Sequence, residues 1–119
     1  MARVVAFIPD LLFGSNVLGA LRAAGHEAVL VSDAEAVRRE LADAQGLVVD
    51  LTADAPERLE QVSSLPRQGI KTLAFYSHVE ADVRAQAERA GFDMVVPRSR
   101  MAREGASLLT RLIGAPDGY

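Results

Sequence analysis

The sequence predicts a three-layer α/β protein built on a doubly wound, five-stranded parallel sheet with strand order 2-1-3-4-5. Short apolar runs alternate five times with helix-like segments, and the connections between them are only a few residues long. Alternation of this kind requires a parallel sheet with right-handed crossovers and helices on both faces. In such a sheet, binding sites lie outside the carboxyl ends of the strands, at the switch point between the first and third.

The five strands are expected where apolar and β-branched residues cluster. The first and third are continuous apolar runs, which are typical of strands buried on both faces of a sheet. The first run stops at Pro9, because proline cannot donate to a ladder, and the third ends on the carboxylate of Asp50. In chain order, the strands are expected at residues 3–8, 27–31, 47–51, 71–76 and 94–96.

Helix boundaries are predicted from capping residues and glycines. Gly14 or Ser15 is expected to cap a first helix that ends at Gly25, in the usual C′ position. Ser-x-x-Glu sequences that begin at Ser32 and Ser77 predict capping boxes for the second and fourth helices. The helices are expected at about residues 15–24, 33–44, 56–65, 78–90 and 101–113. This succession of elements is typical of a flavodoxin-like fold.

Length and composition narrow the class of protein. A chain of 119 residues is expected to form one domain over residues 1–114, followed by a frayed tail over 115–119. There is no cysteine for a disulfide or thiolate metal site, no apolar run long enough to span a membrane, and no signal-peptide pattern at the N-terminus. The net charge of −3 argues against non-specific binding to nucleic acid. We therefore expect a cytoplasmic protein without nucleic-acid or membrane partners.

Polar side chains follow four of the expected strands, namely Asp10, Asp50, Ser77 and Arg98. Two carboxylates from adjacent strands are suited to Mg²⁺, and a serine hydroxyl beside a guanidinium is suited to phosphate oxygens. The alternative interpretation gives the same residues structural roles. Asp10 and Asp50 are then turn residues, Ser77 is a helix cap, and Arg98 is a solvated charge.

Three segments, in this order and spacing, resemble the receiver domain of two-component response regulators. Residues 46–51 are similar to the strand that ends on the family's phosphoacceptor aspartate, and residues 72–77 to the fourth strand with its terminal Ser or Thr. Residues 85–96 are similar to the family's helix-to-strand turn before the fifth strand. The resemblance covers nearly the whole chain and implies the same flavodoxin-like fold.

The resemblance also implies a phosphoacceptor site. Asp50 would accept a phosphoryl group from a histidine kinase or a small phosphodonor. Mg²⁺ would be held by Asp50, by an acidic pair that includes Asp10, and by the backbone carbonyl of Thr52. Ser77 and a lysine after the fifth strand, for which Arg98 is the nearest candidate, would contact the phosphoryl oxygens. Each role is positioning plus charge neutralisation, as phosphoryl transfer requires.

The sequence departs from the family's pattern at this same site. Pro9 replaces one carboxylate of the acidic pair, and Pro97 stands at the lysine position, with Arg98 one residue late. An arginine fork does not substitute for a lysine point charge. Met94 replaces the aromatic that reports phosphorylation, and His78 stands where the family prefers a small residue. Because a hydrogen bond to a charged group contributes about 1.5–3 kcal/mol, these losses are expected to weaken the site substantially.

Together these features predict a stand-alone, atypical receiver-like protein, or pseudo-receiver, that acts in signalling by contact with a kinase or output protein. It is not expected to be an enzyme. Phosphorylation of Asp50 is expected to be weak or absent, and binding of Mg²⁺ weak. The alternative is a flavodoxin-like module that binds a small molecule or an anion, with Gly14, Ser15 and Asn16 offering free amides at a helix N-terminus. Against it, the chain has no Gly-x-Gly-x-x-Gly sequence and no Ser/Thr-rich phosphate-binding run.

Overall fold

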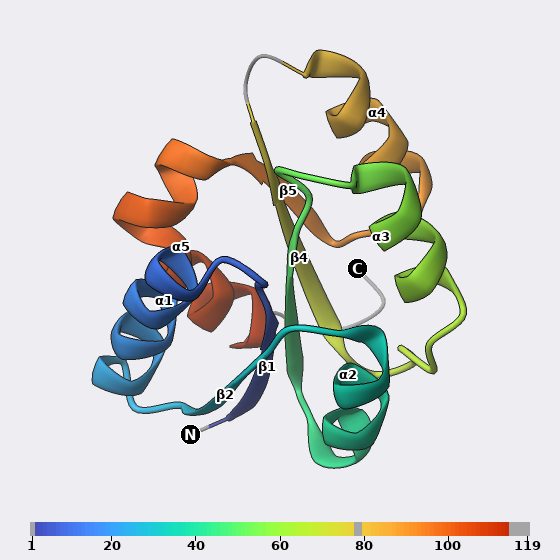
Figure 1. Cartoon of the computed structure of the whole chain (residues 1–119). Helices are drawn as coiled ribbons and strands as arrows, with labels where there is room; N and C mark the ends of the chain where they lie inside the picture. The colour runs from blue at the N-terminus through green and yellow to red at the C-terminus, as the bar shows by residue number, and fades with distance from the viewer. Residues whose placement is uncertain (1, 78–79, 115–119) are drawn as a thin grey trace.

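The structure, a computed structural model, describes residues 2–77 and 80–114, which form one parallel sheet flanked by helices (Figure 1). The strand order is β2-β1-β3-β4-β5, which confirms the predicted fold class and topology. The strands are β1 (Arg3–Phe7), β2 (Glu27–Val31), β3 (Gly46–Asp50), β4 (Lys71–Tyr76) and β5 (Met94–Pro97). The helices are α1 (Leu11–Ala23), α2 (Ala34–Glu40), α3 (Ala55–Ser63), α4 (Ala81–Arg89) and α5 (Arg98–Gly114), with a 3₁₀ turn η1 (Leu41–Asp43) after α2.

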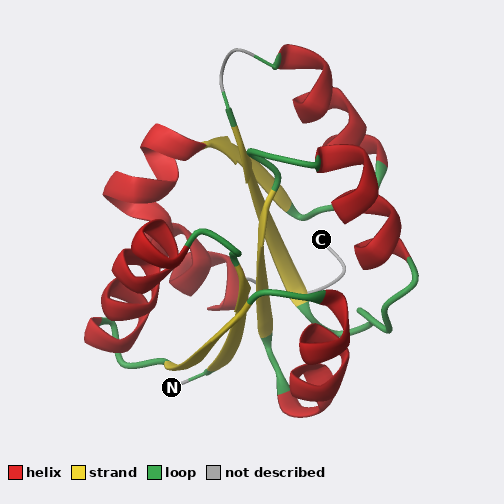
Figure 2. Ribbon diagram, in the orientation of Figure 1, coloured by secondary structure: helices red, strands yellow, loops and turns green. Residues whose placement is uncertain are grey.

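The helices divide between the two faces of the sheet. Helices α1 and α5 cover one face, and α2, α3 and α4 cover the other (Figures 1 and 2). Each face has its own apolar cluster, and β3 contributes to both: Val48 packs towards α1 and α5, whereas Leu47 and Val49 pack towards the opposite helices. This alternation along one strand fixes which face a side chain at the end of the strand occupies.

Helix α1 packs very closely on the sheet at Gly14. A Cβ atom at this position would lie 2.8 Å from Leu30 Cδ1 and 3.3 Å from the Ile8 carbonyl oxygen. Both distances are shorter than ordinary van der Waals contact, so a side chain at this position would require Leu30 to move and would crowd the Ile8 carbonyl. Gly14 is therefore explained by packing, and not by a role at the helix terminus.

The predicted N-termini of four helices are wrong, namely those of α1, α2, α5 and α4. Helix α1 begins at Leu11, because Asp10 Oδ1 accepts a hydrogen bond from the Phe13 amide at 3.1 Å and caps the helix four to five residues earlier than expected. Helix α2 is capped in the same way by Asp33, which accepts from Ala36, and not by Ser32. Helix α5 begins at Arg98 and not at about residue 101. In the first two cases a carboxylate outcompetes a neighbouring cap candidate.

The capping box predicted at Ser77 does not form. Helix α4 begins at Ala81, its N-cap is Glu80, and no side chain makes a capping hydrogen bond there. The Ser77 carbonyl instead accepts from the Glu80 amide at 2.9 Å, so Ser77 opens a turn. His78 lies outside the described residues.

The predicted C-termini agree better with the structure. Gly25 and Gly91 have φ values of 92° and 91°, as expected for glycines that follow a helix at C′. Pro56 lies in the first turn of α3 and the helix ends at Ser63, before Pro66. The second helix is shorter than predicted, because η1 replaces its last turn. Among the described residues, none of the helices is both long and apolar enough to cross a membrane.

Candidate functional site at the carboxyl edge of the sheet

The carboxyl ends of β1, β3, β4 and β5 lie at one edge of the sheet. The register pairs Phe7 with Val49, Asp50 with Phe75, and Tyr76 with Pro97. Residues that directly follow these strands therefore emerge together. The structure places the residues singled out from the sequence at this edge: Asp10, Asp50, Thr52, Ser77 and Arg98.

Asp50 is the last residue of β3, and only 4% of its surface is exposed. It shares the sheet face of Val48, so its carboxylate lies on the side of α1 and α5. Oδ1 accepts hydrogen bonds from the Thr52 amide at 2.8 Å and from the Thr52 hydroxyl at 2.5 Å. The carboxylate is thus held in a fixed orientation by a turn that it forms with the residue two positions on.

Thr52 contacts Asp50 through groups other than the backbone carbonyl to which the resemblance gives a role. Its amide and hydroxyl both donate to Asp50 Oδ1. The carboxyl group of Asp50 is therefore hydrogen-bonded although it is buried. Thr52 therefore fits the structural interpretation of Asp50 as a turn residue at least as well as the functional one.

Arg98 and Asp10 face each other across the switch point. Asp10 Oδ1 caps α1, while Oδ2 lies 4.0 Å from Arg98 Nη2, and both side chains are about half exposed. The Arg98 guanidinium lies over the Phe13 ring, 4.1 Å from its centroid. The Phe13 ring in turn contacts Phe75 with centroids 5.1 Å apart. Arg98 is therefore held over an aromatic pair and beside Asp10.

Ser77 directly follows β4 and is half-buried. Phe75 packs on the α1 and α5 side of the sheet, and the alternation of strand side chains places residue 77 on that same side. Asp50 also lies on that side. If this alternation continues past the end of β4, the hydroxyl and the carboxylate share one face of the carboxyl edge, and Ser77 starts a turn there and not a helix.

Arg58, near the start of α3, lies at the same edge. The sequence did not indicate that it would be part of the site. Its Nη1 donates to the Asp50 carbonyl oxygen at 2.9 Å, and its guanidinium lies over the Phe7 ring at 5.0 Å from the centroid. Its Nε atom is buried and has no hydrogen-bond partner among the described residues. Arg58 reaches the edge from the face opposite that of Arg98.

Pro9 explains why the backbone carbonyl of Asp50 accepts a hydrogen bond from the Arg58 side chain and not from β1. The Leu51 amide donates to Phe75 on β4, so the Asp50 carbonyl points the other way, towards β1. The Ile8 amide donates to Val31 on β2, so the next group that faces β3 is at residue 9. That residue is a proline without an N–H. Arg58 supplies the donor that the ladder lacks. In the sequence, Pro9 indicates that a hydrogen-bond donor is missing, but it does not indicate which residue replaces it.

The residues at this edge provide fewer ligands for Mg²⁺ than the resemblance implies, because Pro9 has no carboxylate. Within residues 2–77 and 80–114, no group of three or more His, Cys, Asp or Glu side chains is arranged to hold a metal ion. Asp10 Oδ1 caps α1 and Asp10 Oδ2 lies 4.0 Å from Arg98 Nη2, while Asp50 Oδ1 accepts from Thr52. Pro9 offers no ligand, and a guanidinium is bonded to the Asp50 carbonyl. Mg²⁺ is usually held by one or two carboxylates together with waters in a near-octahedral arrangement.

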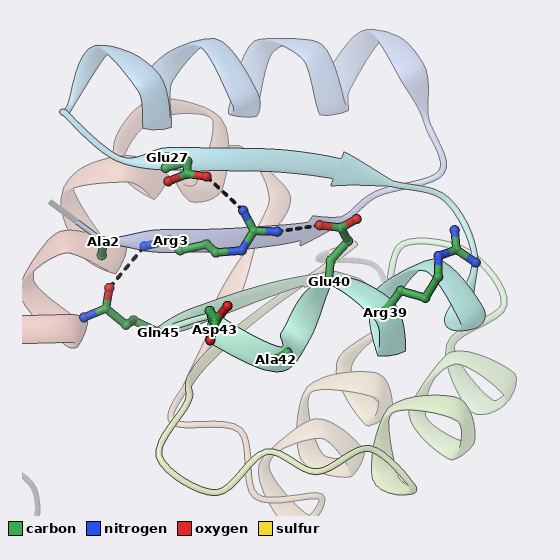
Figure 3. A pocket seen from close by; sticks show the side chains of 8 residues that line it. All are labelled: Ala2, Arg3, Glu27, Arg39, Glu40, Ala42, Asp43 and Gln45. Carbon is green, nitrogen blue, oxygen red and sulfur yellow. Dashed lines mark hydrogen bonds and ion pairs between the residues drawn. The ribbon is translucent and has the colours of Figure 1, made fainter.

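The opposite edge of the sheet holds a pocket of about 440 Å³ in which Arg3 is paired with two carboxylates (Figure 3). Arg3 lies between Glu27 and Glu40 and pairs with both, at 3.0 Å to Glu27 Oε1. Its amide donates to Gln45 Oε1 at 3.1 Å. Arg3, Glu27 and Glu40 pair with one another, so we interpret them as residues that stabilise the amino edge of the sheet and not as a binding site.

Comparisons with known proteins place this fold. No protein-family model and no curated protein matches the sequence. A response regulator from Thermotoga maritima aligns over 97% of this chain and 99% of its own, with a TM-score of 0.78 and 17% identity. The receiver domain of the Francisella response regulator 1452 aligns over 96% and 98%, with a TM-score of 0.80 and 11% identity. NtrX from Brucella abortus aligns over 95% of this chain and 26% of its own, with a TM-score of 0.81 and 15% identity. Over its described length, this chain has the fold of a response regulator receiver domain.

Proposed function

We propose that this protein is an atypical receiver-like signalling module that acts by contact with a partner protein, and in which phosphorylation of Asp50 is weak or absent. The fold supports the receiver-like part of this proposal. The position of Asp50 at the end of β3, at the switch point of the sheet, supports it as the centre of the site. We propose no catalytic activity for the module itself.

The position of Arg98 carries the proposal of weak phosphorylation. A phosphoryl group on Asp50 would need a cation close to its oxygens. The Arg98 guanidinium lies over Phe13 and beside Asp10, and it would have to leave both to serve Asp50. Pro9 and Pro97 remove two further groups that the resemblance implies. The site therefore retains an aspartate, but residues 9, 97 and 98 do not supply to it the charges that the resemblance implies.

The start of α1 supports contact with a protein partner. Leu11 and Leu12 are 72% and 77% exposed, and they are the large apolar side chains exposed among the described residues. The first charged residue of α1 is Arg22, so most of the helix presents an uncharged surface. Two adjacent exposed leucines lose contact with water on association, which favours a protein partner at this position. They directly follow Asp10, so a partner bound there would also cover the carboxyl edge.

Arginines elsewhere are poorer candidates for such a contact. The exposed candidates are Arg84 on α4 and Arg100 and Arg103 on α5. Arg84 pairs with Glu88 at 3.8 Å, and Arg100 and Arg103 both approach Glu104, at 3.4 and 3.7 Å. Pairs of this kind on exposed helix faces stabilise a helix slightly. They indicate solvated helix surfaces.

The alternative of an anion-binding module loses its main support. It depended on Gly14, Ser15 and Asn16 standing at a helix N-terminus with free amides. Helix α1 begins three residues earlier, and the Gly14 amide donates to the Asp10 carbonyl at 2.8 Å. Gly14 itself is buried against Leu30. These amides therefore belong to the helix interior.

Phosphorylation can be tested directly. The protein is incubated with Mg²⁺ and acetyl phosphate, and its intact mass is measured under conditions that preserve acyl phosphates. We expect little or no added phosphoryl mass. Stoichiometric addition that is lost in the Asp50→Asn variant would contradict the proposal. A receiver domain that is efficiently phosphorylated under the same conditions serves as the positive control.

A further inference from the structure

The carboxyl edge carries a cation of its own. We infer that the guanidinium of Arg58, and not a divalent metal, supplies the positive charge next to Asp50, so that this edge works without Mg²⁺. The inference deepens the proposed function and rests on it for the role of Asp50. It concerns a residue of α3 that contacts the end of β3 directly.

The first step is the gap in the ladder between β1 and β3. The Asp50 carbonyl points to the position of residue 9, where proline provides no donor. A buried carbonyl without a partner is unfavourable. Compared with the acidic residue that the resemblance implies at this position, Pro9 therefore changes the end of β1 in two ways. It removes a metal-binding carboxylate and leaves an acceptor that attracts a donor.

The second step is the way in which Arg58 fills this gap. Nη1 donates to Asp50 at 2.9 Å while the flat guanidinium packs on Phe7, a residue of β1. One side chain thus joins α3 to the ends of both strands. The Arg58 amide also donates to Asp54, whose φ of 53° lies in the left-handed region. The loop between Asp50 and α3 is therefore fixed at both ends.

The third step is electrostatic. A guanidinium stays protonated at all physiological pH values and cannot be displaced by deprotonation. A second cation bound at the end of β3 would be repelled by the charge that Arg58 places on the Asp50 backbone carbonyl. The carboxylates that would offset this repulsion are Asp10, which faces Arg98, and Asp50, which is held by Thr52. Contact with a partner at this edge is consequently expected to be insensitive to Mg²⁺.

The inference is tested by titrating Mg²⁺ into the full chain and following backbone amide signals by NMR. For the wild-type protein we expect no saturable shift in residues 51–54 at millimolar Mg²⁺. The variant that combines Pro9→Asp with Arg58→Gln restores a carboxylate and removes the resident cation. Changes around a metal site alter affinity by roughly 10–100-fold, and we expect a gain of at least that size, with shifts centred on Asp50.

A matched control uses Arg67, which makes the same two kinds of contact at the other edge. It donates to the Ala90 carbonyl at 3.3 Å and lies over the Phe92 ring at 5.7 Å. Pro9→Asp combined with Arg67→Gln should not gain Mg²⁺ affinity. Pro9→Asp combined with Arg58→Lys keeps a cation and should not gain either. Equal gains in the Arg58→Gln and Arg67→Gln pairs would overturn the inference.

The outcomes separate this inference from the proposed function. Saturable Mg²⁺ binding by the wild-type protein that is lost in Asp50→Asn overturns the inference, even if no phosphoryl group is taken up. Efficient phosphorylation of Asp50 in the presence of a chelator overturns the proposal of weak phosphorylation and leaves the inference standing. Efficient phosphorylation that requires Mg²⁺ overturns both.

Discussion

The hydroxyl of Thr52 donates to Oδ1 of Asp50 at 2.5 Å, and the amide of the same residue donates to the same oxygen. A carboxylate that is almost wholly removed from water is thereby paired with a residue two positions away. The buried charge at the end of β3 depends on this short turn. Four predictions test how this turn and its neighbours contribute to stability, and whether the adjacent apolar surface binds a partner.

Thr52→Val removes the hydroxyl donor while keeping the shape of the side chain. A hydrogen bond to a charged group contributes about 1.5–3 kcal/mol, so we expect the free energy of unfolding to fall by about that amount. Urea unfolding followed by circular dichroism measures it. Thr52→Ser keeps the hydroxyl and should lose much less. A valine variant as stable as the wild-type protein would show that Asp50 does not depend on this bond.

The roles of Pro9 and Arg58 are coupled, and a double-mutant cycle measures the coupling. Arg58→Gln should destabilise the protein by about 1–3 kcal/mol, because a buried carbonyl loses its donor. In a Pro9→Ala background, the amide of residue 9 is free to donate to Asp50, so the same Arg58 substitution should cost less. Independent sites give additive effects within about 0.5 kcal/mol. Additivity here would contradict the assignment of Arg58 as the replacement donor.

How much of this could be predicted from the sequence differs from element to element. The strands and their order follow from apolar runs and short connections, which are local properties, and Gly25 and Gly91 end their helices as expected. The N-termini of α1 and α2 were misplaced because Asp10 and Asp33 compete with nearby serines and glycine for the same role. Which of these residues becomes the N-cap depends on the backbone conformation at the start of each helix, which the sequence pattern does not determine.

The contact of Arg58 with Asp50 was beyond sequence reasoning for a different reason. It depends on which way one carbonyl points, and that follows from the register of three strands. Pro9 was noticed as a missing carboxylate. Its missing N–H matters equally, but its consequence becomes visible only when β1 and β3 are placed side by side. Whether Asp50 accepts a phosphoryl group and whether Ser77 contacts it remain predictions.

Two glycines of α1 should respond in opposite directions to the same substitution. Gly14→Ala places a Cβ atom 2.8 Å from Leu30, and overpacking of this kind costs about 1–3 kcal/mol. Gly19→Ala meets no atom within 4 Å, so it should stabilise the helix by about 0.5–1 kcal/mol. Thermal and urea unfolding of both variants provide the measurement, and each serves as the control for the other. A neutral Gly14→Ala would contradict the close approach of α1 to the sheet.

The exposed leucines at the start of α1 should matter for association and not for folding. Leu11→Ser combined with Leu12→Ser replaces side chains that are largely in water, so the free energy of unfolding should change by less than about 0.5 kcal/mol per substitution.

Photo-crosslinking in cells tests the contact: a photoreactive residue at position 12 should give a discrete crosslinked product. The same residue at position 84, on the exposed face of α4, is the matched control. A product of equal yield at both positions would indicate random encounter. Loss of the product when Leu11→Ser is added would tie it to this apolar surface, since removing one leucine from a small contact removes much of the area that favours binding.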